Sequence, residues 1–172
     1  MHPRIAELLA YVDSQTGRLR TAFERIPADR RGTRPAPDRW SPAENIHHLT
    51  IVERRLTHRI AGLIEEARKL APEDDTTSLF PMIAANKVET RDQRFTTSEA
   101  SEPSDTDASR VWEDFAGARK ELTAVISTGD GLRLGAVSAP HPVLGAFSAY
   151  EWIAFVGAHA ARHAQQIEEI PE

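Results

Sequence analysis

The sequence feature that most constrains the fold is a run of residues near the C-terminus, Glu151 to Ile167, with apolar side chains at helical spacing. These positions recur every three or four residues, which places them on one face of an α-helix. The face consists of Trp152, Phe155, Val156, His159, His163, Gln166, Ile167 and Ile170. Because an apolar face turns toward the core, both of its histidines are expected to point into the protein.

His159 and His163 are spaced so that they can act together. Residues four apart on a helix have Cβ atoms roughly 5 to 6 Å apart, and two imidazoles at that spacing can share one metal ion. A pair of hydrogen-bonded core histidines is the alternative. Small neighbours favour a cavity, because they leave the space beside the rings unfilled. These neighbours are Ala158, Ala160, Ala161 and Ala164.

Three further segments have helical periodicity, and stretches rich in proline and glycine separate them. We therefore expect four helices, at residues 3–26, 41–70, 107–128 and 148–167. Two serine–glutamate pairs three residues apart, one at each start of the second and fourth helices, match the capping box. We expect Asp107 to be the N-cap of the third helix.

A third histidine, His48, lies on the apolar face of the second predicted helix together with Val52 and Leu56. Its neighbour His47 is rotated by about 100° from that face, so His48 is the better ligand candidate. Glu44 precedes His48 by one turn, where its carboxylate could orient the imidazole. A capping role explains Glu44 equally and is the interpretation that we favour.

Two connections between the predicted helices are long. Residues 72–105 are rich in acidic residues, threonine, serine and proline, with a short helical or docked segment expected at 79–85. A connection of this length can serve as a lid over a site; a plain crossover is the alternative. Residues 129–147 contain several glycines and prolines and are expected to form turns and loop.

The chain has 172 residues, no cysteine and a formal net charge of −5. This length suits a single domain. The lack of cysteine excludes zinc–thiolate sites and a cysteine nucleophile from this chain. A negative charge without a lysine- and arginine-rich stripe argues against a nucleic-acid partner. We find no apolar run long enough to span a membrane and no signal peptide, so we expect a cytoplasmic protein with no membrane partner.

Three stretches resemble the DinB-like (DinB/YfiT-like) family: Trp40-Ser-Pro-Ala-Glu-Asn-Ile-His-His48, His141-Pro-Val-Leu-Gly145 and the helix after Glu151. The resemblance covers nearly the whole chain. It implies an all-α fold, a four-helix bundle in up-down-down-up order with long connecting loops, formed by one domain over residues 1–172. Members of the family include thiol-dependent transferases and isomerases, and others have no assigned activity.

The resemblance also implies a divalent metal held by His48, His159 and His163. Three neutral imidazoles leave coordination positions open, as in catalytic zinc sites. Zinc is the metal that we favour, with nickel, iron and manganese as alternatives. The residues between His159 and His163 are Ala-Ala-Arg, without the glutamate base of H-E-x-x-H enzymes. Because a metal can bind a substrate thiol as its thiolate, thiol transfer is the leading hypothesis.

Other assignments follow less directly. Arg162 and Gln166 could contact an anionic substrate, although ion pairing and helix packing also explain them. We expect a small-molecule substrate, a low-molecular-weight thiol among the reactants, and a homodimer. The homodimer rests on the resemblance and on off-face apolar residues such as Ile51 and Ile64. A non-catalytic metal- or ligand-binding bundle and a metal-dependent hydrolase stay open as alternatives. The remaining histidines are interpreted as structural or exposed: His2, His47, His58 and His141.

Overall fold

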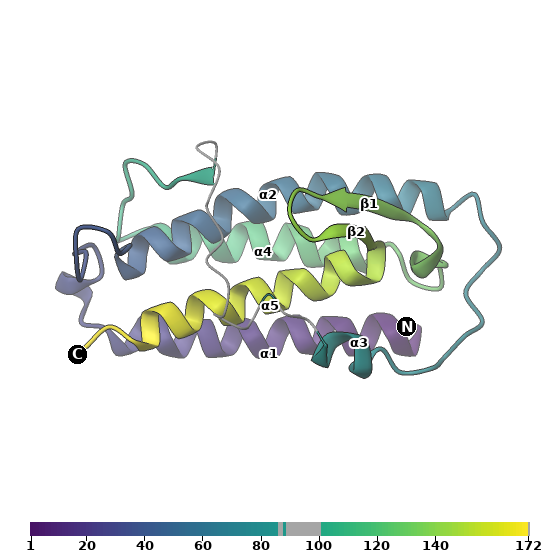
Figure 1. Ribbon diagram of the computed structural model, residues 1–172, viewed down its shortest axis with the longest axis horizontal. Helices are drawn as coiled ribbons and strands as arrows, with labels where there is room; N and C mark the ends of the chain where they lie inside the picture. The colour runs from purple at the N-terminus through teal and green to yellow at the C-terminus, as the bar shows by residue number, and fades with distance from the viewer. Residues whose placement is uncertain (86–87, 89–100, 172) are drawn as a thin grey trace.

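A computed structural model describes residues 1–85, 88 and 101–171 and is mostly helical, as predicted. Its long helices lie side by side (Figure 1). They are α1 (Pro3–Arg25), α2 (Pro42–Ala67), α4 (Val111–Ser127) and α5 (Ala149–Glu168). The shorter elements are η1 (Ala28–Arg30), α3 (Phe80–Ala84), η3 (Leu134–Ala136), β1 (Ser138–His141) and β2 (Gly145–Ser148). No helix in the described part of the chain is long and apolar enough to cross a membrane.

Helix α5 packs against both α1 and α2, and α2 also packs against α4. In Figure 1, α1 and α5 run in one direction, and α2 and α4 run in the other. A glycine makes the contact between α1 and α5 close, because a Cβ atom at Gly157 would lie 2.4 Å from the Cε1 atom of Tyr11. Almost the whole of α5 is buried as a result. Histidines on α5 that face α2 therefore lie inside the protein.

The capping boxes are present at the starts of α2 and α5, as predicted. The Glu44 carboxylate accepts a hydrogen bond from the Ser41 backbone N–H at 2.8 Å, and the Ser41 hydroxyl accepts one from the Glu44 N–H at 3.1 Å. The start predicted for the third helix is wrong. Helix α4 begins at Val111, because the carboxylate of Asp107 accepts from the backbone N–H of Ser109 and closes a separate turn before the helix.

The prediction of a loop at residues 129–147 is also wrong in part, since a β-hairpin forms within it. Strands β1 and β2 pair antiparallel, with Ser138 opposite Ser148 and His141 opposite Gly145. Gly145 has φ of 89°, a conformation that side chains disfavour and that lets the chain reverse here. The Trp152 indole N–H donates to the carbonyl oxygen of Ala139 at 3.3 Å and fastens the hairpin to α5.

Two further expectations have different outcomes. The short helix expected near residue 80 is present as α3. The lid expected within residues 72–105 falls in part on residues 86–87 and 89–100, which lie outside the described residues. Ile64, which we counted as a surface residue for a homodimer, is only 1% exposed and belongs to the core.

A buried ion pair joins α2 to α4. The Nε atom of Arg119 donates to a Glu53 carboxylate oxygen at 2.9 Å, and one NH group of Arg119 binds the other oxygen. The second NH group donates to the hydroxyl of Thr16 and the carbonyl oxygen of Val12 on α1. The guanidinium also lies over the ring of Phe115, 5.1 Å from its centroid. Both charges are therefore satisfied inside the protein.

Candidate metal centre

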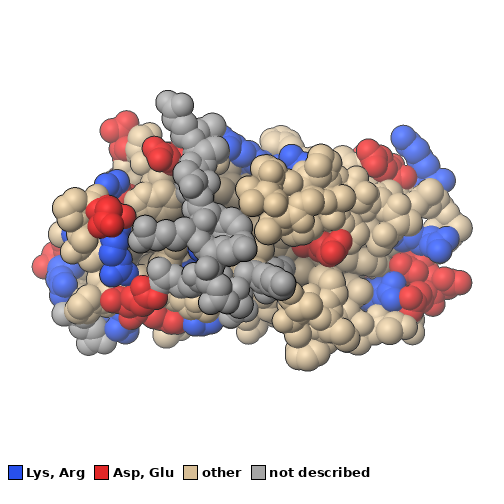
Figure 2. Space-filling view, in the orientation of Figure 1, with Lys and Arg blue, Asp and Glu red and all other residues tan. Residues whose placement is uncertain are grey.

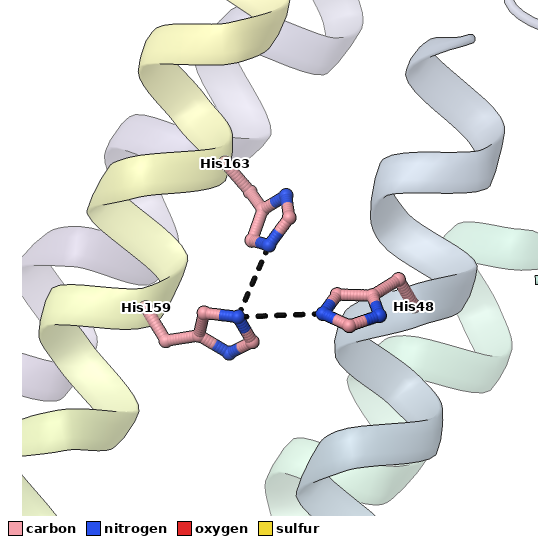
Figure 3. A group of neighbouring side chains, drawn as sticks. All are labelled: His48, His159 and His163. Carbon is pink, nitrogen blue, oxygen red and sulfur yellow. Dashed lines mark hydrogen bonds between the residues drawn. The ribbon is translucent and has the colours of Figure 1, made fainter. Parts of the chain in front are cut away.

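His48 on α2 and His159 and His163 on α5 point toward one another between the two helices (Figure 3). Each offers a ring nitrogen, and these atoms all lie within 4.8 Å of one another. The Nε2 atom of His159 is 3.4 Å from that of His48 and 3.1 Å from that of His163. Two helices thus bring His48 next to a pair of histidines that is 111 residues away in the sequence.

The opposite ring nitrogens of two of these histidines have fixed partners. The Nδ1 atom of His48 lies 2.8 Å from the carbonyl oxygen of Ser101, which can only accept a hydrogen bond. The Nδ1 atom of His163 lies 2.8 Å from the side-chain oxygen of Asn45. The Asn45 amide nitrogen donates to the Ser41 carbonyl oxygen at 2.9 Å, which fixes the orientation of this side chain. Both rings therefore carry their proton on Nδ1 and present a lone pair from Nε2.

The three Nε2 atoms have too few protons for both short N···N contacts to be hydrogen bonds. With the Nδ1 positions of His48 and His163 protonated, a neutral His159 can donate an Nε2 proton to only one of them. The other short N···N contact would then leave a lone pair without a donor. A bound divalent cation would accept a lone pair from each of the three rings and remove this conflict. The three residues therefore fit a metal ion, and their outer partners are of the kind that orients histidine ligands.

Burial keeps all three imidazoles neutral. It lowers the pKa of His48, and it lowers the pKa values of His159 and His163 well below 6.5, with the neighbouring histidines adding to the effect. A hydrogen bond with Gln166 opposes the shift at His163. Metal ligands must be deprotonated, so these side chains are in the required form at neutral pH.

A model of the DinB superfamily matches residues 3–167 of the chain. The chain belongs to this superfamily. The match confirms the resemblance that the sequence suggested and spans every residue of the three-histidine group. No curated protein and no solved structure matches the chain. Family membership agrees with a metal-binding role, and the identity of the metal stays a prediction.

The other predicted site residues lie in different surroundings. The carboxylate of Glu44 takes part in the cap and pairs with Arg34, whose Nη2 atom is 2.6 Å from it. Burial raises the pKa of Glu44, but the hydrogen bonds from Arg34 and Ser41 outweigh it, so the pKa is lowered. Arg162 and Gln166 line the cavity beside the histidines. Arg162 is buried and donates to the carbonyl oxygen of Val88 at 3.3 Å.

The non-ligand histidines are separate from the centre. The Nδ1 atom of His47 lies 2.8 Å from the hydroxyl of Thr106. His2 accepts the backbone N–H of Arg4 through Nδ1 and caps α1. His58 is exposed at the rim of the cavity. His141 is half-buried in a group of aromatic rings and also lines the cavity.

A cavity of about 790 Å³ opens beside the three histidines and extends between α2 and α5 to the hairpin. Trp40 lies at the histidine end, with its ring centroid 4.9 Å from that of His48 and 6.2 Å from that of His163. Phe155 stacks on His159 with centroids 5.2 Å apart. These rings limit how far the imidazoles can turn. They also provide apolar walls for a small molecule.

Sequence reasoning missed several of these groups. Asn45 lies one turn before His48 on the same helix, so its spacing could have marked it as a partner of the site. Trp40 directly precedes the Ser41 cap, so its position at the start of α2 could have marked it in the same way. The role of Ser101 depends on its backbone carbonyl, which no side-chain pattern can indicate.

Proposed function

We propose that the protein is a metal-dependent enzyme that transfers a low-molecular-weight thiol to a small electrophile. The observation that carries this proposal is the group of three ring nitrogens within 4.8 Å at one end of a cavity. A bound divalent ion, zinc by preference and nickel, iron or manganese as alternatives, would supply positive charge that lowers the pKa of a thiol below about 8.5. The chain itself has no cysteine, so the thiol must come from a second molecule.

The protein residues hold and orient the reactants. The three imidazoles are neutral and leave the charge of a metal undiminished. Asn45 and the Ser101 carbonyl retain the Nδ1 protons and keep the Nε2 atoms directed inward. Trp40 and Phe155 pack against the imidazole rings and limit their rotation. Thiol transfer needs no further protein base once the thiol has lost its proton.

The lining of the cavity supports this choice over a hydrolase. Among the described lining residues, Glu66 is the carboxylate-bearing side chain, and it is exposed. It lies five helical turns from His48 along α2. A hydrolase of this type needs a base within hydrogen-bond reach of the attacking water. The absence of such a group beside the three histidines, within the described part of the chain, favours an external nucleophile.

We further propose a single domain over residues 1–172, a four-helix bundle in up-down-down-up order, located in the cytoplasm. The homodimer also belongs to this proposal and now rests on the family resemblance and Ile51, because Ile64 is buried. Light scattering of the purified protein at micromolar concentrations tests it. A mass of 19.1 kDa over that range would refute the dimer.

The activity is tested by incubating metal-loaded protein with common cellular thiols and a panel of electrophiles. We expect conjugation with at least one thiol, loss of that activity with a chelator or in His163→Ala, and retention in His47→Ala. Bound metal without conjugation by any thiol would favour a non-catalytic metal- or ligand-binding protein. Water-dependent cleavage without a thiol would instead favour a hydrolase.

A further inference from the structure

The hairpin end of the cavity carries polar groups that the three-histidine centre does not use. Arg59 of α2 and His141 of β1 both lie against the indole of Trp152. The Arg59 Cζ atom is 4.8 Å from the Trp152 ring centroid, and the His141 ring centroid is 5.3 Å from it. One NH group of Arg59 donates to the carbonyl oxygen of Pro140 at 3.2 Å. These contacts hold a cation and an imidazole side by side at the cavity wall.

The guanidinium of Arg59 has more N–H donors than its bond to Pro140 uses. Its bond to Pro140 uses one of the five N–H groups of a guanidinium. Within residues 1–85, 88 and 101–171, no carboxylate forms an ion pair with it. A planar fork of N–H groups is suited to binding both oxygens of a carboxylate. The contact with Trp152 presets the direction of this fork.

His141 offers a second donor whose direction is also fixed. Its Nδ1 atom accepts hydrogen bonds from the backbone N–H groups of Val143 at 3.2 Å and Leu144 at 3.1 Å. Burial and the charge of Arg59 lower its pKa, so the ring is neutral. The single ring proton must then lie on Nε2. This atom has no partner among the described residues and is not sealed from the cavity.

The charge of the cavity lining is opposite in sign to that of the whole chain. The charged side chains among its described residues are Arg55, Arg59, Arg162 and Glu66. The formal net charge of the chain is −5. The outer surface over the hairpin is mostly uncharged (Figure 2), so the arginines do not belong to a general basic patch. Such a lining attracts an anion into the cavity.

We propose that the hairpin end of the cavity binds the carboxylate of a small organic acid. Arg59 and the Nε2–H of His141 donate to the carboxylate oxygens, and Trp152 and Phe155 pack against the apolar body of the acid. The other end of this molecule then lies toward the three histidines. The proposal rests on the thiol-transfer function, because it assigns the class of substrate that this same cavity accepts.

Calorimetric titration with phenylacetate and its neutral analogue phenylacetamide tests the proposal. Each probe is added to the metal-loaded protein and to the chelator-treated protein, so that attraction to a metal can be subtracted. We expect the parent to prefer phenylacetate in both states. Arg59→Met should reduce phenylacetate affinity about 10- to 100-fold and change phenylacetamide affinity little. Arg54→Met removes an exposed α2 arginine that does not line the cavity and should change neither.

Further variants separate recognition from hairpin stability. His141→Asn keeps an oxygen acceptor for the hairpin N–H groups and removes the ring donor, so the phenylacetate preference should decrease with little change in Tm. Arg59→Lys keeps the charge and should restore part of the preference. Equal losses for both probes in Arg59→Met would mean that Arg59 only tethers the hairpin. That result, or a parent that does not prefer phenylacetate, overturns the proposal. Metal content and thiol transfer are measured separately and test the proposed function independently.

Discussion

The protein buries two groups of polar side chains between its helices, and they are completed in different ways. The Glu53–Arg119 pair contains opposite charges and fills its hydrogen bonds with Thr16 and Val12. The three-histidine group contains three neutral rings, and a proton on His159 can satisfy only one of its two short N···N contacts. The first group is complete within the chain, whereas the second could take up a cation from outside.

This difference distinguishes polar groups that are buried to support the fold from polar groups that are buried at a candidate functional site. Taking a polar group out of water costs free energy unless a partner replaces the water. Burial raises the pKa of Glu53 and the charge of Arg119 opposes that shift, so the protein itself supplies the compensation. At the histidines, burial lowers the pKa values, and the Ser101 carbonyl and Asn45 hold the Nδ1 atoms of His48 and His163. The Nε2 atoms are directed toward one another.

The largest expected effect is the loss of metal when one of the three histidines is removed. His159→Ala deletes the ring that lies between the other two, and we expect metal affinity to fall more than about 100-fold. Elemental analysis after gel filtration measures it. His47→Ala is the matched control, because that ring bonds to Thr106 and should leave metal content unchanged. The reverse result would show that the ligand assignment is wrong.

Breaking the Glu53–Arg119 pair should affect folding and leave the metal in place. Glu53→Ala leaves the Arg119 charge buried and unpaired, so the free energy of unfolding should fall by about 3–5 kcal/mol. Denaturant titration measures this change. The double variant Glu53→Leu with Arg119→Met should recover most of the loss. A metal content that falls in the folded single variant would mean that the two groups are coupled.

Removing the Asn45 side chain should have a smaller effect on metal binding by the three-histidine group. Asn45→Ala removes the acceptor of His163 Nδ1 and should weaken metal binding about 10- to 100-fold, with little change in the ligand set. Asn45→Asp keeps an acceptor and should bind metal more tightly than Asn45→Ala. Competition with a chelator dye gives the affinities. Thr50→Val is the control, since Thr50 is buried on the same helix and its hydroxyl donates to the Ile46 carbonyl.

The smallest expected effect is the response of the metal-free protein to pH. The lowered native pKa values mean that, below the usual value of 6.5, the unfolded chain binds more protons than the native one. The free energy of unfolding is therefore greatest above pH 6.5 and falls as the pH decreases toward the native values. The loss is about 0.7 kcal/mol per imidazole between pH 7 and pH 6.

Denaturant titrations of chelator-treated protein at several pH values measure this slope. His163→Gln removes one of the titrating rings and should reduce the slope. Equal slopes in the parent and the variant would mean that the pKa of His163 is not lowered by burial in solution.

The long helices and the three histidines were predictable because their signals are local. Helical spacing placed His48, His159 and His163 on inward faces, and the serine–glutamate pairs marked two helix starts. The hairpin was not predictable, because its two four-residue strands are interrupted by the prolines and glycines typical of loops. Its stability comes from a distant element, through the bond from Trp152 to Ala139.

Polar contacts between elements depend on tertiary structure in the same way. Glu53 is a common helix residue, and only the approach of α4 makes it half of an ion pair. His141 occupies a segment that reads as a loop, and its aromatic neighbours come from β2 and α5. Periodicity can show which face a residue occupies. It cannot show which distant residue faces it.

The two capping boxes have a consequence for how this chain tolerates insertions and deletions. Each box fixes the first residue of a helix, so the position of each imidazole is set by counting along the chain from Ser41 or Ser148. One inserted residue between a box and its histidine would turn the ring by about 100° and move it about 1.5 Å along the axis. Length changes within these two intervals should therefore abolish the site, whereas a length change between Ala67 and Val111 alters neither count.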